Sequence, residues 1–547
     1  MSGQIEGNHM VSFGRWKLAL AGAASALLVA CGGGGDSSQY GEMLRRGISA
    51  NPDTLDPHKS SAQWENIIIG DMFNGLFVTS ADGRPVLGVA ESYEIDDTQT
   101  VWTFKLKETL WSDGTPLTAN DFVFAFQRLQ DPTTAGQYAS LLWLVKNAAE
   151  LNRGEVAPED LGIRALDDYT LEITLEYPAP YLPGLLTHYT TYPVPRHIVE
   201  EHGDRWIRPE NIAVNGPYKL IDWTVGSSLI AVKNDNWYGT EELCFDSVAY
   251  FPISDLNAVE RMIEAGELDV NNAFEGPRKD EIERRLPGWV RADPSLTVTY
   301  WAFNQEVEPF DDVRVRKALA MALDREFMTE NVLTPGFLPA YNFVPPGIDN
   351  YVDGDGAPRV DWADMPRAER LLEARRLLEE AGFGPDNPLE FTYMYRNTGD
   401  NMKPPPVAQQ NWKQIADWVE PELLLQDTKV LYARLREGDF EFSDAGWVAD
   451  FNDPHNFLYL LDSQTGQLNY GNFSNPEFDA LLAQSNLELD LDRRADLLAQ
   501  AEQIMLDEVP LTPMWFAVNQ NLVDPTLTGW EDNVVDIHRS KYLCRAE

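Results

Sequence analysis

Apolar and polar residues alternate in several short stretches of the chain, and this period of two predicts β-strands. The clearest stretches are residues 101–106 (VWTFKL), 171–175 (LEITL) and 229–232 (LIAV). Other stretches repeat with the helical period. We expect one helix to begin at Thr118, where Thr-Ala-Asn-Asp resembles a capping box with Asp in place of Glu, and to run through Leu129. The pattern therefore predicts a mixed α/β protein.

Further helices are marked by their ends. Asp312 is placed to cap one helix, and residues 367–381 form another, with Gly382 as the expected C-cap. A helix over residues 492–506 is expected to stop near Pro510. Strands and helices do not alternate regularly, and no loose linker divides the mature chain. This organisation favours domains that the chain crosses several times, with a ligand-binding cleft between them.

The first residues have the composition of an export signal. Arg15 and Lys17 precede an apolar run over residues 18–30, which is too short to span a bilayer but suits a signal-peptide core. The run ends in Leu-Val-Ala-Cys at Cys31, which resembles the lipobox of bacterial lipoproteins, and a Gly-rich tether follows. We expect removal of residues 1–30 and lipidation of Cys31. An ordinary secretory signal with a chance cysteine is the alternative.

Charge and cysteine content narrow the function classes. The chain of 547 residues carries 43 basic and 87 acidic side chains, a net charge of −44 that repels nucleic acid and anionic lipid headgroups. After Cys31 only Cys244 and Cys544 remain, and in an oxidising compartment they favour one disulfide over two free thiols. Their spacing fits no metal site, and the chain lacks a nucleophile elbow and a phosphate-binding loop. We therefore expect no cofactor and no enzyme, with a secreted hydrolase as the distant alternative.

Motifs in a fixed order carry a family resemblance. They occupy residues 51–58 with 71–76, 111–122 with 126–132, 215–218 with 234–238, 310–319 with 324–325, and 445–454. On these motifs, nearly all of residues 40–547 resembles the extracellular solute-binding proteins of oligopeptide and dipeptide ABC importers, the family 5 type. The resemblance implies an α/β, two-lobed periplasmic-binding-protein-like fold with an additional third domain and discontinuous lobes joined by a hinge.

The same resemblance divides the chain. The expected segments are 1–30 (signal peptide), 31–39 (lipidated tether), 40–73, 197–296 and 518–547 (lobe I), 74–196 (extra domain II) and 297–517 (lobe III). It implies a monomer, exported and held at the membrane only through lipidated Cys31, that binds extended peptides along their backbone and delivers them to importer permease subunits. The wider family also binds metal chelates, sugars and opines, so a non-peptide solute is the alternative ligand.

Asp450 is the most specific site residue that the resemblance implies, because the aspartate of the Gly-Trp-x-Ala-Asp motif receives the ligand's α-amino group. A peptide ammonium that leaves water needs a fixed carboxylate as partner. The alternative is that Asp450 only caps the turn before Pro454. Other residues expected to line the cleft are Gln63, Tyr138, Asn271, Asn272 and Trp447. For Tyr138 and Trp447, an ordinary core position is the alternative.

One position departs from the family pattern. Enterobacterial members tend to carry an arginine directly before Ala-Gly-Trp, where it helps to receive a peptide carboxylate. This chain has Asp444 there. Recognition of the peptide's carboxyl end and of its length is therefore expected to differ.

Overall fold

The computed structural model describes residues 40–333, 335–352 and 354–546, and every structural statement below concerns these residues. The expected signal peptide, the tether and Cys31 lie outside them. The largest sheet has 11 strands in the order β10-β11-β12-β1-β13-β19-β14-β18-β16-β17, with β15 paired to β19. Its strands are β1 (Met43–Ile48), β10 (Tyr218–Thr224), β11 (Ser228–Lys233), β12 (Ser247–Pro252), β13 (Val270–Asn271), β14 (Val290–Phe303), β15 (Leu338–Pro339), β16 (Leu389–Arg396), β17 (Val419–Gln426), β18 (Phe442–Val448) and β19 (Leu511–Val523).

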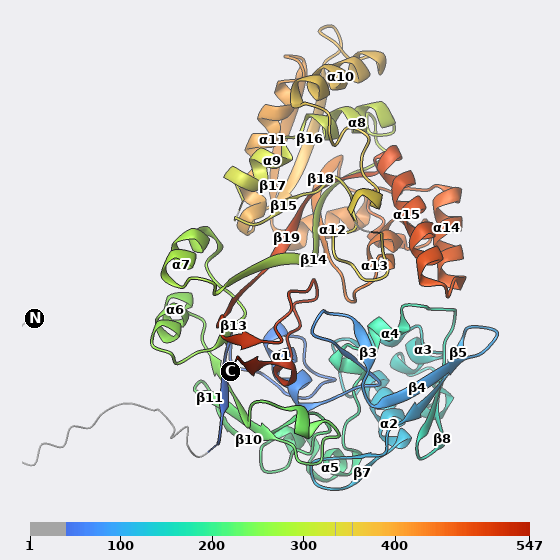
Figure 1. Ribbon diagram of the computed structural model, residues 1–547. Helices are drawn as coiled ribbons and strands as arrows, with labels where there is room; N and C mark the ends of the chain where they lie inside the picture. The colour runs from blue at the N-terminus through green and yellow to red at the C-terminus, as the bar shows by residue number, and fades with distance from the viewer. Residues whose placement is uncertain (1–39, 334, 353, 547) are drawn as a thin grey trace, which may run out of the picture. The chain divides into compact units, whose positions relative to one another are not determined.

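Two long antiparallel strands, β14 and β19, join the halves of this sheet, and Figure 1 shows them side by side. One end of β19 pairs with β13, next to β1, whereas the far end of β14 pairs with β18, next to β16. The ladder between β14 and β19 is interrupted between Pro294 and Val298. The chain therefore crosses between the two halves along these strands, and their pairing is loosened midway.

Smaller sheets and the helices cover the remaining chain. A four-stranded sheet runs β4 (Ala90–Ile95), β5 (Val101–Leu106), β9 (Thr170–Thr174), β8 (Ile163–Asp167). The strand pairs are β2 (Phe77–Thr79) with β3 (Pro85–Leu87), β6 (Thr109–Leu110) with β7 (Pro116–Leu117), and β20 (Leu527–Thr528) with β21 (Cys544–Arg545). The helices are α1 (Gln63–Met72), α2 (Ala119–Gln130), α3 (Ala148–Asn152), α4 (Leu182–Leu185), α5 (Arg196–His202), α6 (Leu256–Glu264), α7 (Lys279–Arg285), α8 (Val313–Ala322), α9 (Arg325–Asn331), α10 (Arg367–Glu380), α11 (Pro404–Lys413), α12 (Thr428–Glu437), α13 (His455–Leu458), α14 (Pro476–Leu487) and α15 (Leu491–Glu508).

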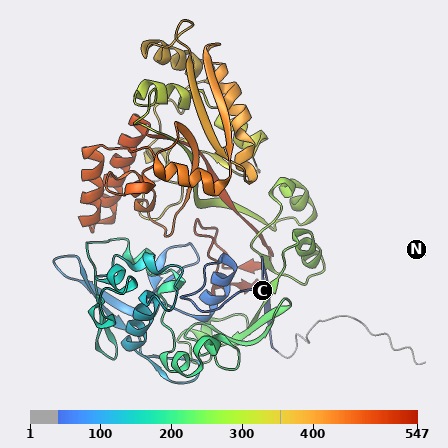
Figure 2. The ribbon, with the colours of Figure 1, turned by 180° about the vertical axis from the view of Figure 1, so that it is seen from behind.

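The buried apolar residues form three hydrophobic clusters. The first gathers buried residues of the span 44–250 and of the C-terminal segment. The second gathers residues of the span 296–534, and a small third cluster lies at α6 and α7. Helices α14 and α15 pack on each other beside the second cluster, in red in the view from behind (Figure 2). The expected lobe and domain boundaries stay predictions.

The local sequence signals correspond to observed elements. The three alternating stretches are strands β5, β9 and β11, and each of the four expected helices is present as α2, α8, α10 or α15. The Thr118 N–H donates to the Asp121 carboxylate at 2.8 Å, and Asp312 accepts from the Arg314 N–H at 2.9 Å. One detail is wrong: the C-cap of α10 is Ala381, and Gly382 is the next residue, with a φ of 99° that favours glycine.

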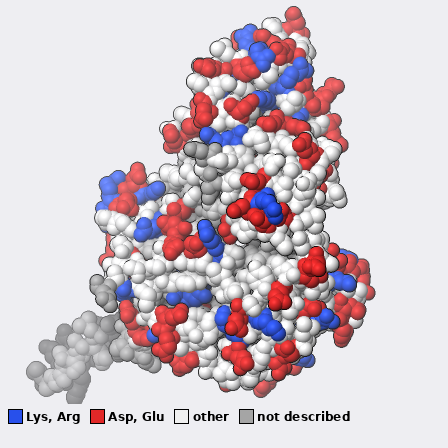
Figure 3. All heavy atoms as spheres, turned by 45° about the vertical axis from the view of Figure 1, so that its right-hand side comes forward, with Lys and Arg blue, Asp and Glu red and all other residues white. Residues whose placement is uncertain are grey.

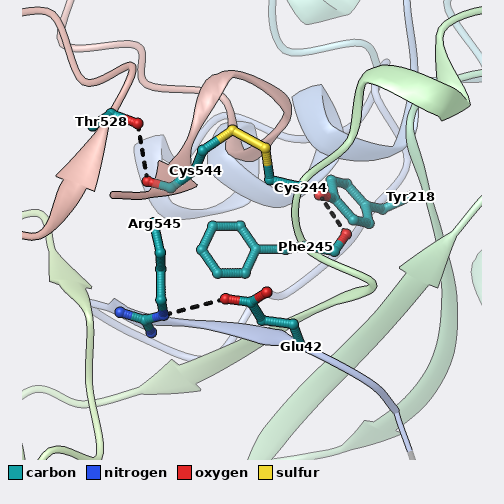
Figure 4. The surroundings of a disulfide bond; sticks show 7 residues. All are labelled: Glu42, Tyr218, Cys244, Phe245, Thr528, Cys544 and Arg545. Atoms are coloured by element: carbon teal, nitrogen blue, oxygen red, sulfur yellow. Dashed lines mark hydrogen bonds and ion pairs between the residues drawn. A yellow bond between two sulfur atoms is a disulfide. The ribbon is translucent and has the colours of Figure 1, made fainter. Parts of the chain in front are cut away.

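The structure joins Cys244 and Cys544 in a disulfide across 300 residues of sequence (Figure 4). Around it, the Tyr218 hydroxyl donates to the Phe245 carbonyl at 3.2 Å, and the Arg545 guanidinium lies over the Phe245 ring at 5.6 Å. The bond ties the C-terminal strand β21 to the segment before β12.

Acidic and basic side chains are interspersed on the face shown in Figure 3, and that face carries no continuous basic patch. Within the described part of the chain, no helix combines the length and the hydropathy that a membrane crossing requires.

Candidate functional site

Three cavities share walls and bring several of the expected site residues together. The Asp450 cavity has a volume of about 500 Å³, the Gln63 cavity about 390 Å³, and a small connecting cavity about 150 Å³. Tyr138 lines the first two, and Asp450 lines the first and the third. The lining of the Asp450 cavity is Tyr138, Ser140, Leu141, Trp143, Leu144, Tyr177, Tyr181, Leu185, Asp450, Phe451, His455, Asn456, Tyr459 and Leu468.

The Gln63 cavity lies where the ladder of β14 is interrupted. Its lining is Ser61, Ala62, Gln63, Asn66, Tyr138, His188, Tyr189, Ser295, Leu296, Thr297, Val448, Ala449, Asn519, Val534, Val535 and Asp536. The small cavity adds residues of β2, of the β2–β3 turn, of α4 and of the C-terminal segment. The walls therefore come from segments that are far apart in sequence.

A larger groove of about 1120 Å³ lies along β16, β17 and α11. Its lining is Glu390, Phe391, Thr392, Gln409, Lys413, Asp417, Val419, Glu420, Pro421, Glu422, Leu423 and Glu441. Because it contains none of the expected site residues and draws its walls from neighbouring elements alone, we place the site in the three connected cavities.

Asp450 lies in the turn that follows β18, and hydrogen bonds from neighbouring residues hold this turn in place. Asn456 Oδ1 accepts the Trp447 Nε1–H at 2.9 Å and the Asp450 N–H at 3.4 Å. The Asp453 carboxylate accepts the His455 N–H at 2.9 Å and pairs with Arg494 at 2.7 and 2.8 Å. Asp453, and not Asp450, therefore accepts the first N–H of the short helix α13, whose N-cap residue is Pro454.

The Asp450 carboxylate itself is open for a ligand. Among the residues that the structure describes, none forms a hydrogen bond or ion pair with its carboxylate oxygens. The Asp450 side chain is exposed, but the surrounding walls bury it enough to raise its pKa. Burial and, after it, the Asp450 charge raise the pKa of Tyr138 and that of Tyr459. A negative charge without a cationic partner thus stands in this cavity.

Aromatic rings from two distant segments close the walls beside Asp450. The Tyr181 ring stacks on Phe451 and on His455, each at 5.1 Å between ring centroids. His455 also stacks on Tyr459 at 6.0 Å. Burial lowers the pKa of His455 to about 4, so its imidazole is neutral at pH 7. The lining of this cavity is therefore largely aromatic, and its one charged group is the Asp450 carboxylate, which suits a ligand with an apolar body and a cationic end.

A chain of polar contacts leads from the Gln63 cavity to the expected Asn271–Asn272 turn. Gln63 Nε2 donates to Asp536 at 3.1 Å, and Asn521 Nδ2 donates to the same carboxylate at 2.7 Å. Asn272 Nδ2 in turn donates to Asn521 Oδ1 at 2.9 Å, whereas Asn271 Nδ2 donates to the Ala273 carbonyl at 2.6 Å. Neither Asn271 nor Asn272 is among the lining residues of the three cavities.

Trp447 also lies behind the walls. It is half-buried, packs with the second hydrophobic cluster and meets Tyr459 at 5.9 Å between ring centroids. Its indole N–H holds Asn456, which does line the Asp450 cavity. The structure thus places Gln63, Tyr138 and Asp450 in the walls, Trp447 one contact away through Asn456, and Asn272 two contacts away through Asn521 and Asp536.

Asp444, which departs from the family pattern, is buried at 1% exposure and paired. Arg396 Nε donates to its Oδ2 at 2.7 Å and Arg396 Nη2 to its Oδ1 at 3.0 Å, while Arg396 Nη1 donates to the Tyr432 hydroxyl at 2.8 Å. Burial raises the pKa of Asp444 and the Arg396 charge opposes that rise. The opposite charges of Arg396 and Asp444 therefore compensate each other inside the protein.

Sequence reasoning missed several lining residues. Tyr181, Phe451, His455, Tyr459 and Asp536 belong to the walls, and only Phe451, next to Asp450, had a local signal. In the described residues, no group of three or more His, Cys, Asp or Glu side chains is arranged to hold a metal ion.

Comparisons with known proteins agree with this architecture. The chain is 37% identical over 494 residues to the periplasmic oligopeptide-binding protein OppA of Salmonella typhimurium, covering 89% of this chain and 90% of that protein. Among solved structures, the unliganded open form of the murein tripeptide-binding protein MppA superimposes with a TM-score of 0.87 at 32% identity, covering 92% of this chain and 97% of that one. OppA of Haemophilus influenzae in complex with the peptide RPPGFSPFR superimposes with a TM-score of 0.68 at 32% identity, covering 93% and 99%.

The neighbours carry the periplasmic peptide-binding fold, which is the expected two-lobed α/β class. The family model of the bacterial extracellular solute-binding proteins, family 5 (middle), matches residues 84–469, more than half of the chain. The chain belongs to the family 5 extracellular solute-binding proteins.

Proposed function

We propose that this protein captures peptides in the three connected cavities and delivers them to an ABC-type membrane importer. The observation that carries the proposal is the Asp450 carboxylate, which has no partner among the described residues and stands beside stacked aromatic rings. A peptide's α-ammonium is the complementary group. Because its burial without a partner costs several kcal/mol, the carboxylate selects ligands that carry it.

The backbone of β14 and β18 supports an extended ligand. Ser295, Leu296 and Thr297 line the Gln63 cavity at the interruption of the β14–β19 ladder, and Val448 and Ala449 follow from β18. Main-chain groups next to an interrupted ladder suit the addition of a peptide strand. Such contacts do not depend on side-chain identity, so one site accepts many sequences.

The relatives support the ligand class and the compartment. OppA proteins are named for oligopeptide binding in the periplasm, and one is solved with a nonapeptide bound. We infer that this chain is likewise exported, acts as a monomer and is held at the membrane by a lipid on Cys31. Its partners are a peptide and the permease subunits of the importer, with no nucleic acid.

We infer binding without catalysis. The lining of the Asp450 cavity contains neither cysteine nor lysine, and its one imidazole, His455, is stacked and neutral. A non-peptide solute is the second candidate, because the apolar walls also suit a compact hydrophobic ligand with a positive end.

Ligand release followed by re-binding tests the proposal. Mass spectrometry of the compound released on denaturation of the purified protein should identify peptides. Ligand-free protein should then be stabilised by added peptide, by about 2.7 kcal/mol at a hundredfold excess over Kd, and the peptide should be recovered intact. Release of a non-peptide compound together with no stabilisation by peptides would contradict peptide capture, and shortened peptides would show an enzyme.

A further inference from the structure

The charged side chains in the walls of the three connected cavities are all negative. Asp450 and Asp536 are their carboxylates, and none of the lining residues is a lysine or an arginine. The lining imidazoles do not supply the missing positive charge, because burial lowers the pKa of His188 to about 3 and that of His455 to about 4. Within the described residues, the charged groups of the cavity lining are therefore acidic alone.

The guanidinium groups behind these walls are engaged by other partners. Arg396 is paired with Asp444, and Arg494 is paired with Asp453 at 1% exposure. Arg539 donates to the Asn66 carbonyl at 2.6 Å and to its Oδ1 at 2.9 Å, behind a residue that lines two of the cavities. Each of these cations is buried or held away from the space that a ligand would fill.

Arg84 lies in sequence between Gly83 and Pro85, which line the small cavity. Its side chain is 68% exposed and pairs with Asp82 at 3.5 Å and with Asp349 at 3.7 Å. A charge that is hydrated and already shared between two carboxylates attracts a ligand carboxylate only weakly.

Charges of both signs lie behind Asp536, because the buried Arg46 guanidinium interacts with its carboxylate and the Arg291 charge lowers the pKa of the nearby Asp293. The neighbour of Asp536, His538 at 3.3 Å, has a pKa lowered by burial and is neutral at pH 7. Asp293 and Asp532 are neighbouring carboxyls. Burial, and after it the Asp532 charge, raises the pKa of Asp293 to about 6. Asp536 is fixed in direction by Gln63 and Asn521, which are uncharged.

We propose that this site selects peptides by charge: it favours ligands with additional positive charge and leaves their terminal carboxylate without a protein cation. The inference rests on the proposed peptide function and deepens it. Asp450 receives the amino end, and Asp536, in the adjoining cavity, receives a second positive group such as a basic side chain. A ligand carboxylate that entered these walls would lose its water without gaining a partner and would meet two like charges.

Calorimetry with matched tripeptides tests the proposal. Ala-Lys-Ala, Ala-Gln-Ala and Ala-Glu-Ala share size and a free amino end, and each is prepared as a free acid and as an amide. The lysine peptide should bind at least about tenfold tighter than the glutamate peptide, a difference of about 1.4 kcal/mol. Each amide should bind at least as tightly as its acid. In Asp536→Asn, the ratio between lysine and glutamate peptides should shrink.

Binding of the uncharged peptide Ala-Gln-Ala distinguishes a failure of charge selection from a failure of peptide capture. If Ala-Gln-Ala binds while the three side chains give equal affinities, or if the acids bind tenfold tighter than the amides, charge selection is overturned and peptide capture stands. If none of the peptides binds, both proposals fail. The wild-type series decides these outcomes without any variant, so they hold even where Asp536→Asn folds poorly.

Discussion

The buried pair beneath the Asp450 turn allows a quantitative test of how the site is held. Arg494 of α15 is 1% exposed, Asp453 is 3% exposed, and two parallel hydrogen bonds of 2.7 and 2.8 Å join them. In Arg494→Ala the carboxylate stays buried without its partner. Loss of one member of such a pair costs about 3–5 kcal/mol of unfolding free energy. Because Asp453 also accepts the first N–H of α13, the turn that presents Asp450 should loosen and peptide affinity should fall with it.

Urea unfolding followed by tryptophan fluorescence measures this cost. Arg493→Ala is the matched control, since the preceding residue of the same helix is 69% exposed and pairs with Glu488 at the surface, so its loss should change stability by no more than about 0.5 kcal/mol. Asp453→Ala and the double variant complete a cycle. The double variant should cost at least about 2 kcal/mol less than the two single losses added together. Additive losses, or an Arg494→Ala effect as small as that of Arg493→Ala, would refute the reasoning.

Three further outcomes are expected elsewhere in the chain. Reduction of the Cys244–Cys544 disulfide should lower stability by on the order of 5 kcal/mol, as expected for closure of a very long loop; two titratable thiols in denatured, unreduced protein would exclude the bond. Burial raises the pKa of Glu502 to about 7 from a usual 4.5, so the wild type should lose up to roughly 3 kcal/mol relative to Glu502→Gln as pH rises from 4.5 to 7; pH-independent differences in urea unfolding would contradict this. Cys31→Ser should move the protein from the membrane to the soluble fraction, and wild-type membrane retention of the variant would argue against the lipid anchor.

Local signals in the sequence predicted the elements well because their causes are local. The contact between Thr118 and Asp121 spans three residues, and an alternating stretch such as β5 depends only on which face it buries. The end of α10 was displaced by one residue because the sequence shows that a glycine is required without showing which helical position it takes.

The site could be predicted only in part from the sequence, because most of its contacts join residues that are far apart along the chain. The motif led to Asp450, but the stack of Tyr181 on Phe451 joins segments that are 270 residues apart. The sequence alone does not show which distant ring an aromatic residue will contact. The pair of Asp444 and Arg396 depends on the register between β16 and β18, which no local pattern specifies. For the same reason the sequence could not show that Asp453, instead of Asp450, caps the turn.

The most direct test of the central claim compares a free peptide with its N-acetylated form, by calorimetry, in wild type and Asp450→Asn. Loss of one partner of a buried charge pair costs about 3–5 kcal/mol, so the free peptide should lose roughly two to three decades of affinity or more in the variant. The acetylated peptide, which has no ammonium, should bind the wild type poorly and lose little further in the variant. Equal affinity of the wild type for the two forms would contradict the role of Asp450 and would favour a non-peptide ligand.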